Sequence, residues 1–341
     1  MYLVTGGSGY FGEVMVQKLL EKGKKVRIFD LNPPNTYLRN KVEVFIGDIT
    51  NISSINEACK NIDCVFHNVA QVPLAKNEKL FYKVNYSGTD NLLKCVKRNR
   101  VSKVVYTSSS AVFGVPKTNP VNENTKPTPK EPYGKAKYDA ELLCEHYNKL
   151  GFNISIVRPR TIVGGGRLGV FSILFDWVSK GYNIPVLNNG SNIYQFIHVE
   201  DLAEICWKLS QRNNPEICNA GATKYYTMRE TLQGLCDHAN TGSKVKNLPM
   251  YWVEKIINIL NFFRLSPLGT YHSLMYGRSL YFDNSKVKNT LKYITKYDNI
   301  EALCHSYDFY VKNIQIDNNK GKSIHQRITK QKILGLLKYF L

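Results

Sequence analysis

Closely spaced cysteines and histidines are missing from this chain of 341 residues. Its eight cysteines include no Cys-x-x-Cys pair, and its seven histidines lie far apart. Dispersed cysteines in a long chain are typical of a reduced intracellular protein, so we expect buried thiols and no disulfide framework. The histidine spacing does not fit a set of metal ligands, and we expect no metal.

Long apolar runs are missing as well. No segment has the ~18 to 20 consecutive apolar residues that a helix needs to cross a bilayer. A strand is expected from residue 2 onward, so we expect no signal peptide and a cytoplasmic location. The hydrophobic fraction of 43% still supports a sizeable core, in one large α/β domain or two modest ones.

Acidic residues are few: Asp and Glu number 27 against 46 Lys and Arg, for a formal net charge of +19. Such a charge fits an anionic substrate, a nucleic acid, an acidic membrane surface, or only a lysine-rich solvated surface. No zinc-finger spacing, RNP-like segment or isolated basic helix is present, so we expect no nucleic-acid partner.

The first twelve residues carry the strongest positive signal. A short apolar strand runs into Gly6, Gly9 and Gly12, and an amphipathic helix follows. In a nucleotide-binding strand–turn–helix unit, the first glycine allows the tight turn, the second lets the backbone approach a pyrophosphate, and the third lets helix and strand pack closely. The helix N-terminus then holds the phosphates. A glycine-rich turn that binds nothing is the alternative.

Carboxylates after the next two expected strands bear on the cofactor. Asp30 ends the second strand, where it can accept hydrogen bonds from ribose hydroxyls and repel a 2′-phosphate. This favours NAD over NADP. Asp48 follows the third strand and is placed either to meet the adenine or to cap the next helix.

Apolar strands and helices alternate through the first half of the chain. Short, continuously apolar strands separated by helices are typical of a parallel sheet covered on both faces. We therefore expect an α/β fold with a doubly wound parallel sheet and, from about residue 165, a smaller, mostly helical lobe. Ligands bind such sheets beyond the carboxyl ends of the strands. The segments that converge there are 6–12, 30, 48, 67–71 and 107–110.

Tyr133 and Lys137 stand four residues apart at the start of an expected helix, on one face. A neighbouring ammonium favours the tyrosinate, so we expect a lowered Tyr133 pKa and a role as general acid or base. Ser109, at a strand end, would orient the reacting oxygen; a turn or helix cap is the alternative. The same spacing begins at Tyr37 and Tyr251, but only the Tyr133 copy follows a serine-rich strand end.

In this order the motifs resemble the extended short-chain dehydrogenases/reductases, within the NAD-dependent epimerase/dehydratase and 3β-hydroxysteroid dehydrogenase-like group. The resemblance covers about residues 1–310. It rests on segments 5–12, 65–70, 85–89, 106–114, 132–137 and 196–203.

The resemblance implies a Rossmann-type fold, NAD as cofactor, Ser109, Tyr133 and Lys137 as catalytic residues, and a homodimer formed through helices near 82–98 and 133–150. The cofactor-binding residues that we expect, from the motifs and the resemblance together, are Gly6, Gly9, Tyr10, Phe11, Gly12, Asp30, Asp48, Ile49, Ala70, Asn85, Ser108, Tyr133, Lys137 and Pro159.

Departures from the family pattern restrict the reactions that we expect of this chain. Ser110 and Ala111 stand where 4,6-dehydratases carry Asp-Glu, so dehydration is not expected, and Thr161 stands where sugar-nucleotide enzymes usually carry Asn. We expect Ser110, Arg160, Thr161 and Arg167 to contact the substrate, with the arginines meeting a phosphate. Pairing of the arginines with acidic neighbours is the alternative.

The expected organisation has three parts. Residues 1–165 form a NAD-binding domain onto which 193–220 pack back, 166–192 and 221–310 form the substrate lobe, and 311–341 form a basic tail. An amphipathic helix at 252–263 is expected in the core or as a lid, and a membrane-facing role is the alternative. The basic tail, with its apolar end, fits weak contact with the inner face of a membrane, and docking on the protein or an oligomer contact are the alternatives.

Three functions remain open. We favour a nucleotide-sugar epimerase, because the basic charge fits an anionic sugar donor. A dehydrogenase or reductase of an apolar, steroid-like alcohol uses the same half-reaction, so the motifs do not separate the two. A non-catalytic NAD-sensing regulator is the third, and the intact set of Ser109, Tyr133 and Lys137 argues against it.

Overall fold

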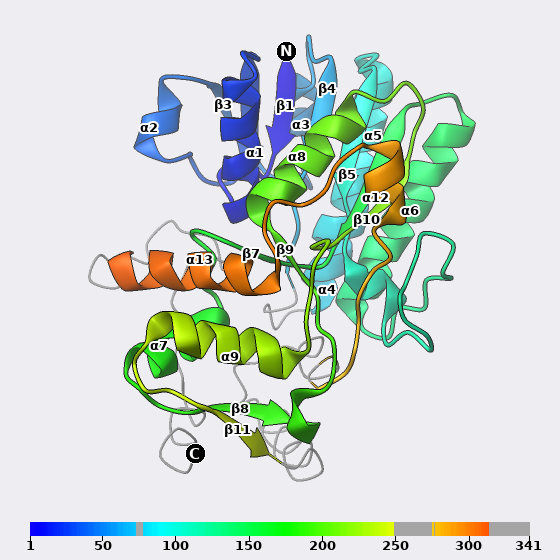
Figure 1. Ribbon diagram of the computed structural model, residues 1–341. Helices are drawn as coiled ribbons and strands as arrows, with labels where there is room; N and C mark the ends of the chain where they lie inside the picture. The colour runs from blue at the N-terminus through cyan, green and yellow to red at the C-terminus, as the bar shows by residue number, and fades with distance from the viewer. Residues whose placement is uncertain (73–77, 249–274, 276, 314–341) are drawn as a thin grey trace.

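A seven-stranded parallel sheet forms the centre of the protein, in a computed structural model that describes residues 1–72, 78–248, 275 and 277–313 (Figure 1). The expected helix at 252–263 and all but the first residues of the basic tail lie outside the described residues. In spatial order the strands are β10 (Ile217–Ala220), β6 (Ile154–Pro159), β5 (Lys103–Thr107), β4 (Cys64–His67), β1 (Tyr2–Thr5), β2 (Val26–Asp30) and β3 (Glu43–Ile46). This order confirms the doubly wound, Rossmann-type sheet.

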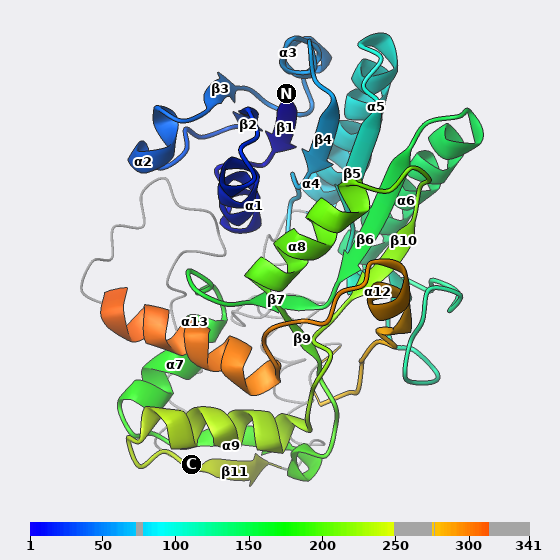
Figure 2. The same cartoon turned by 45° about the horizontal axis from the view of Figure 1, so that its top comes forward.

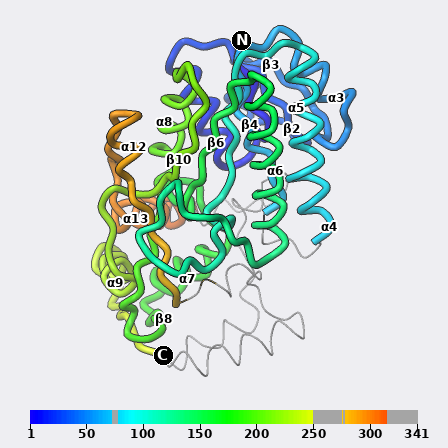
Figure 3. The backbone as a smooth tube through the Cα atoms, turned by 90° about the vertical axis from the view of Figure 1, so that its right-hand side faces the viewer, coloured from blue at the N-terminus to red at the C-terminus, as the bar shows by residue number. Residues whose placement is uncertain are grey.

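Helices cover both faces of the sheet, because each presents one apolar side to it (Figure 3). One face carries α1 (Tyr10–Glu21) packed on α8 (Val199–Ser210), and the other carries α3 (Ile52–Ala58), α5 (Gly88–Arg98) and α6 (Pro132–Lys149). The short α2 (Thr36–Arg39) connects β2 to β3. The inner strands of the sheet are buried on both faces, whereas the edge strand β3 is partly exposed, and the eight cysteines are buried in the sheet layers or in the lower lobe.

The turn between β1 and α1 has the form that its glycines predict. Gly6 has a φ of +72°, a conformation that a side chain disfavours. Gly12 lies so close to the strand end that a Cβ there would stand 1.9 Å from the Gly6 carbonyl oxygen. The third glycine therefore lets the helix pack against the strand end, as expected.

One expected helix is interrupted. The sequence predicts a continuous helix over 82–98, but the chain forms α4 (Glu78–Phe81), then one turn of π-helix (Tyr82–Ser87), and only then α5. The wider turn turns Asn85 inward, where its Nδ2 donates to the Gln71 carbonyl oxygen at 3.0 Å and its Oδ1 accepts from the Gln71 amide at 2.8 Å. Turns of π-helix are rare in proteins, and those that do occur are often found at functional sites.

The lower lobe is built on a second core (Figures 1 and 2). Its elements are α7 (Phe171–Ser179), β8 (Ile184–Leu187), α9 (Met228–Ala239), β11 (Val245–Leu248) and α13 (Asn299–Asn313), with β8 and β11 paired in parallel. A parallel pair, β7 (Thr161–Val163) and β9 (Phe196–His198), lies between this lobe and the main sheet. Among the described residues no helix is long and apolar enough to cross a membrane.

A segment expected in the substrate lobe returns to the main sheet instead. The short helix α12 (Ser285–Thr290) packs beside β10. Val287 and Leu291 belong to the core shared with α1 and α8. Two buried apolar residues four positions apart thus hold this stretch of 221–310 against the cofactor domain.

A buried ion pair fastens α6 to β6. Glu141 on the helix and Arg158 on the strand are 0% and 3% exposed, and Arg158 Nη2 lies 2.6 Å from Glu141 Oε2. Arg158 Nε also contacts both carboxylate oxygens, at 3.0 and 3.1 Å. Because removal of one partner leaves a buried charge without compensation, this pair constrains where α6 sits.

Replacing Glu141 by Gln is expected to lower the free energy of unfolding by about 3–5 kcal/mol, since the Arg158 charge would stay buried without a counter-charge. Urea unfolding followed by circular dichroism measures the change. The exposed Lys94–Asp90 pair on α5 supplies the control, because Lys94→Ala should cost less than about 1 kcal/mol. Equal effects of the two substitutions would contradict the importance given to burial.

Candidate active site

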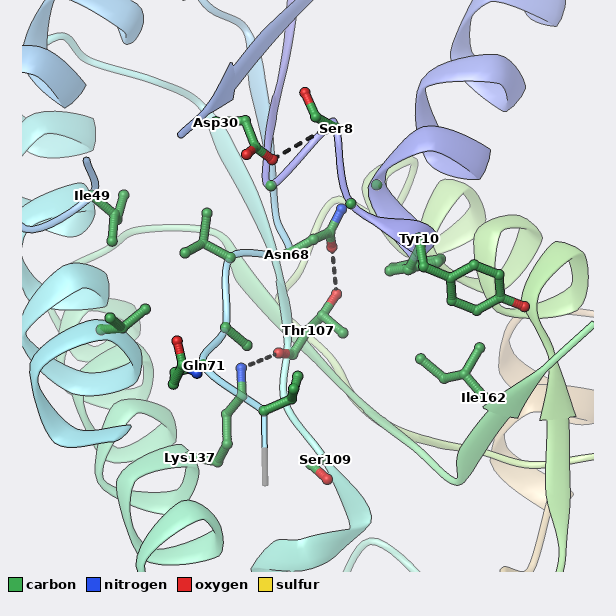
Figure 4. A pocket seen from close by; sticks show the side chains of 18 of the residues that line it. Ser8, Tyr10, Asp30, Ile49, Asn68, Gln71, Thr107, Ser109, Lys137 and Ile162 are labelled. Atoms are coloured by element: carbon green, nitrogen blue, oxygen red, sulfur yellow. Dashed lines mark hydrogen bonds between the residues drawn. The ribbon is translucent and has the colours of Figure 1, made fainter. Parts of the chain in front are cut away.

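A cavity of about 520 Å³ lies at the carboxyl ends of the parallel strands. Its wall includes the glycine turn, the ends of β2, β3, β4 and β5, the start of α6 and the segment after β6. All of the expected site residues except Asn85 line it. The sequence argument that these strand ends converge on one crevice therefore holds in the structure (Figure 4).

The glycine turn and Asp30 fit the NAD that the sequence resemblance implies. A Cβ at Gly9 would meet only the Gly6 carbonyl oxygen, at 3.3 Å, so the backbone there stays open to a pyrophosphate. The Asp30 carboxylate accepts from the Ser8 and Asn32 amides, each at 3.1 Å. These bonds oppose the burial that raises its pKa, and they hold a carboxylate where ribose hydroxyls would bind.

The structure decides between the two roles left open for Asp48 and changes the role expected for Asn85. Asp48 does not cap α3, because Asn51 does so by accepting from the Ser53 and Ser54 amides. Asp48 lines the cavity, with Oδ1 accepting from the Thr50 amide. Asn85 lies behind the cavity wall and fixes the backbone of Gln71, which does line it. Asn85 therefore positions the wall and does not itself form part of it.

The start of α6 is fixed by a capping carboxylate. Glu131 is buried, and its two oxygens accept from the Tyr133 amide at 2.8 Å and the Gly134 amide at 2.6 Å. Pro132 occupies the first turn, where the absence of an N–H is harmless. This cap places Tyr133 at the end of the helix that faces the cavity.

Lys137 is 1% exposed, and its Nζ donates to the Thr107 carbonyl oxygen at 2.8 Å. Figure 4 shows this bond reaching from α6 to the end of β5. Burial lowers the pKa of Lys137 to about 7, and the nearby Glu141 carboxylate partly opposes the shift. The ammonium also lies 4.8 Å from the centre of the Tyr106 ring.

The expectation of a lowered Tyr133 pKa is wrong for this structure. Burial raises the pKa of Tyr133 to about 12, and the Glu131 carboxylate adds to the shift. A hydrogen bond with Ser109 and the charge of Arg167 act in the opposite direction. Since Lys137 donates to Thr107, its ammonium is directed to the strand end and does not compensate for the burial of the phenol.

Ser109 has both of the roles that were open for it. Its side chain accepts from the Ala111 amide and so caps the short 3₁₀ helix Ser110–Phe113. It also lines the cavity and hydrogen bonds with Tyr133. The cap holds the hydroxyl beside the phenol, at hydrogen-bond distance.

Sequence reasoning placed segments 67–71 and 107–110 at this edge but did not predict the polar hydrogen bonds that they make there. The Thr107 hydroxyl donates to Asn68 Oδ1 at 2.7 Å, and both residues line the cavity. His67 is buried between Thr5 and Thr89, with ring nitrogens 2.7 and 3.0 Å from their hydroxyls. Burial lowers the pKa of His67 to about 3. Thr5, His67 and Thr107 each end a strand, and Asn68 follows one, so their positions could be predicted from the sequence. Thr89 lies on α5, and its contact with His67 could not.

The expected substrate residues gather on the side of the cavity formed after β6. Arg160 Nη1 donates to Ser110 Oγ at 2.9 Å, and the Thr161 hydroxyl lies 2.9 Å from the Tyr194 hydroxyl. No described acidic residue lies within ion-pair distance of Arg160 or Arg167. Within the described part of the chain, pairing of these arginines with acidic neighbours is therefore wrong.

Fold and cavity together define an NAD-dependent enzyme of the extended short-chain dehydrogenase/reductase type. The family model for the NAD dependent epimerase/dehydratase family matches residues 2–221. The chain belongs to this NAD-dependent epimerase/dehydratase family, and its cofactor is NAD.

Individual relatives point in two directions. The chain is 47% identical to the uncharacterized protein y4nG of Sinorhizobium fredii, over 99% of this chain and 86% of that protein. It is 32% identical to a putative UDP-glucose 4-epimerase of Methanocaldococcus jannaschii, over 67% of this chain and 79% of that one. It is also 32% identical to the decarboxylating sterol-4-alpha-carboxylate 3-dehydrogenase of Mus musculus, over 58% of this chain and 56% of that protein.

Among solved structures, the UDP-glucose 4-epimerase of Thermus thermophilus in complex with NAD aligns with a TM-score of 0.74. The alignment covers 91% of this chain and 98% of that one at 23% identity. At this level of identity the likeness supports the fold of the chain.

Replacing Lys137 by Met is expected to flatten the pH dependence of stability between pH 7 and 10 in the NAD-free protein. In the folded protein Lys137 loses its proton near pH 7, whereas in the unfolded chain it keeps the proton until about pH 10.4. Between these values the unfolded chain binds more protons, so the free energy of unfolding rises with pH. This one group contributes at most about 1.4 kcal/mol per pH unit.

Urea unfolding at several pH values measures this slope. Lys135, exposed on the same helix, provides the matched control, and Lys135→Met should keep the wild-type slope. An unchanged slope in Lys137→Met would show that Lys137 does not titrate in this range.

Proposed function

We propose that the protein is a nucleotide-sugar epimerase that inverts a carbon bearing a secondary hydroxyl. The observation that carries the proposal is the meeting of Ser109, Tyr133 and Lys137 in one cavity with the glycine turn and Asp30. Bound NAD supplies the hydride acceptor and donor for the carbinol carbon. The other steps fall to side chains of this chain.

Each of the three side chains has a distinct task. The Ser109 hydroxyl, held by its cap, orients the substrate oxygen toward Tyr133. Tyr133 accepts the hydroxyl proton as the carbonyl forms and returns it after reduction on the other face. In the ligand-bound site, the Lys137 ammonium would stabilise the tyrosinate by its charge, which it does not do in the ligand-free protein. Burial disfavours a tyrosinate in the ligand-free protein, so we infer that the site becomes active only when ligands bind.

Charge supports a nucleotide-sugar substrate. The two buried arginines beside the catalytic residues favour an anionic ligand, in a chain of net charge +19. The names of the M. jannaschii relative and of the T. thermophilus structure are in keeping with this proposal.

A second candidate is an NAD-dependent dehydrogenase of an apolar alcohol. The sterol dehydrogenase relative favours it, and so does an apolar part of the cavity wall formed by Val72, Leu80, Val84 and Ile162. The two functions differ in the fate of the cofactor. A dehydrogenase converts one added NAD to NADH in each turnover, whereas an epimerase leaves the amounts of NAD and NADH unchanged.

Tyr133→Phe is expected to lower kcat by about 10²–10⁴-fold, because the variant lacks the group that transfers the hydroxyl proton. Its KM should change little, since the ring remains. The assay incubates the purified enzyme with a panel of UDP- and dTDP-sugars and separates the epimers by anion-exchange chromatography.

Tyr138 on the next part of α6 supplies the control, and Tyr138→Phe should keep the wild-type rate. Wild-type turnover in Tyr133→Phe would contradict the proton-transfer role. Net production of NADH by the wild-type enzyme with an apolar alcohol, and no epimer from any nucleotide sugar, would favour the second candidate.

A further inference from the structure

Two guanidinium groups beside Tyr133 carry charge that no described acidic residue balances. Arg160 follows β6 directly and is 1% exposed, and Arg167 lies between β7 and α7 and is 6% exposed. Both line the cavity. Arg158, two positions before Arg160, forms an ion pair with Glu141, so a neighbouring arginine of the same segment does have a counter-charge.

One edge of Arg160 is buried without a hydrogen-bond partner among the described residues. Its Nη1 donates to Ser110 Oγ, whereas its Nε and Nη2 have no hydrogen-bond partner among the described residues. These two N–H groups share the edge of the guanidinium that binds a carboxylate or phosphate through two parallel bonds. The Tyr194 and Phe282 rings lie 4.5 and 5.8 Å from the guanidinium carbon, so aromatic contacts hold the group in place.

Arg167 lies close to the same part of the cavity. Its Nε likewise has no partner in the described structure. Its charge lowers the pKa of Tyr133, and the tyrosines at 10, 133 and 194 are the groups that oppose the effect of burial on it. Burial lowers the pKa of Arg167 to about 10. A buried cation without a carboxylate is costly, which favours a ligand that brings the negative charge.

We propose that Arg160 and Arg167 bind a carboxylate on the substrate, placed next to the carbon on which Tyr133 acts. Given the proposed function, on which this inference rests, the substrate is a nucleotide sugar of the uronic acid class. The position argues for this class. Arg160 is bonded to the neighbour of Ser109, and a uronic acid carries its carboxylate on the ring carbon beside C4. The nucleotide diphosphate is attached at C1, across the ring from a reacting C4 hydroxyl.

Two probes that differ only at C6 test the proposal: UDP-glucuronate carries a carboxylate where UDP-glucose carries a hydroxymethyl group. Isothermal titration of the NAD-loaded enzyme and turnover assays are run with both. The wild-type enzyme is expected to bind and turn over the acid about ten- to a hundred-fold better, as two charge-assisted contacts predict. In Arg160→Gln and Arg167→Gln this preference should fall towards parity.

Further variants guard against loss of folding. Arg160→Lys keeps the charge but lacks the two-pronged edge, so it should fold, as judged by its melting curve, and still lose much of the preference. Arg212, which is exposed and lies 3.9 Å from Glu216, gives the matched control, and Arg212→Gln should keep the preference.

The outcomes separate this inference from the proposed function. Equal turnover of the two probes by the wild type overturns the carboxylate site and leaves the epimerase standing. If Arg167→Gln no longer retains NAD but still prefers the acid, Arg167 binds the cofactor. Its proposed contact with the substrate carboxylate is then overturned.

If neither nucleotide sugar is turned over, the proposed function fails and the carboxylate site is decided by binding. Free glucuronate should then raise the melting temperature of the NAD-loaded wild type but not of Arg160→Lys, and free glucose should raise neither. Equal responses to the acid and the neutral sugar overturn the site.

Discussion

The hydrogen bond from Lys137 Nζ to the Thr107 carbonyl oxygen joins the two elements on which the active site depends. Helix α6 carries Tyr133, and strand β5 ends beside Ser109. An ammonium that is fully buried has few partners, so its one carbonyl acceptor fixes the separation of helix and strand. The Glu131 cap before this bond in the chain and the buried Glu141 pair after it hold the same helix at two further points.

The electrostatics of the cavity follow from this arrangement. Lys137, Arg160 and Arg167 are buried around one space, and the described carboxylates that contact its wall cap helices or stand on the ribose side. Ionisation of Tyr133 is unfavourable in this buried position, as its raised pKa indicates, unless a bound ligand changes its surroundings. The proposal of an anionic substrate rests on these buried charges and not on the lysine-rich surface.

Sequence patterns predicted the sheet, the glycine turn and most of the cavity wall because these follow from local rules. Parallel strands place their carboxyl ends at one edge, so residues such as Asp30 and Ser109 meet without knowledge of side-chain packing. The π-helical turn at Asn85 could not be predicted in this way, since it depends on the distant Gln71 backbone. The return of α12 to the main sheet likewise rests on Val287 fitting a core built by other elements.

Charges were the least predictable part. Arg158 and Arg160 stand two positions apart in one segment, and only the structure shows that the first meets Glu141 and the second does not. The spacing of Tyr133 and Lys137 correctly placed both in the cavity, but it did not reveal that the ammonium donates to a strand carbonyl. Pairing and burial are tertiary properties, and they set the pKa values that spacing alone misjudged.

The account's central claim is that NAD stays in the cavity and is recycled there. The most direct measurement is to purify the protein without added cofactor, denature it and quantify the released NAD and NADH. The account predicts close to one cofactor per chain. Protein that releases no cofactor, and that converts added NAD to NADH with each turnover, would contradict recycling in place.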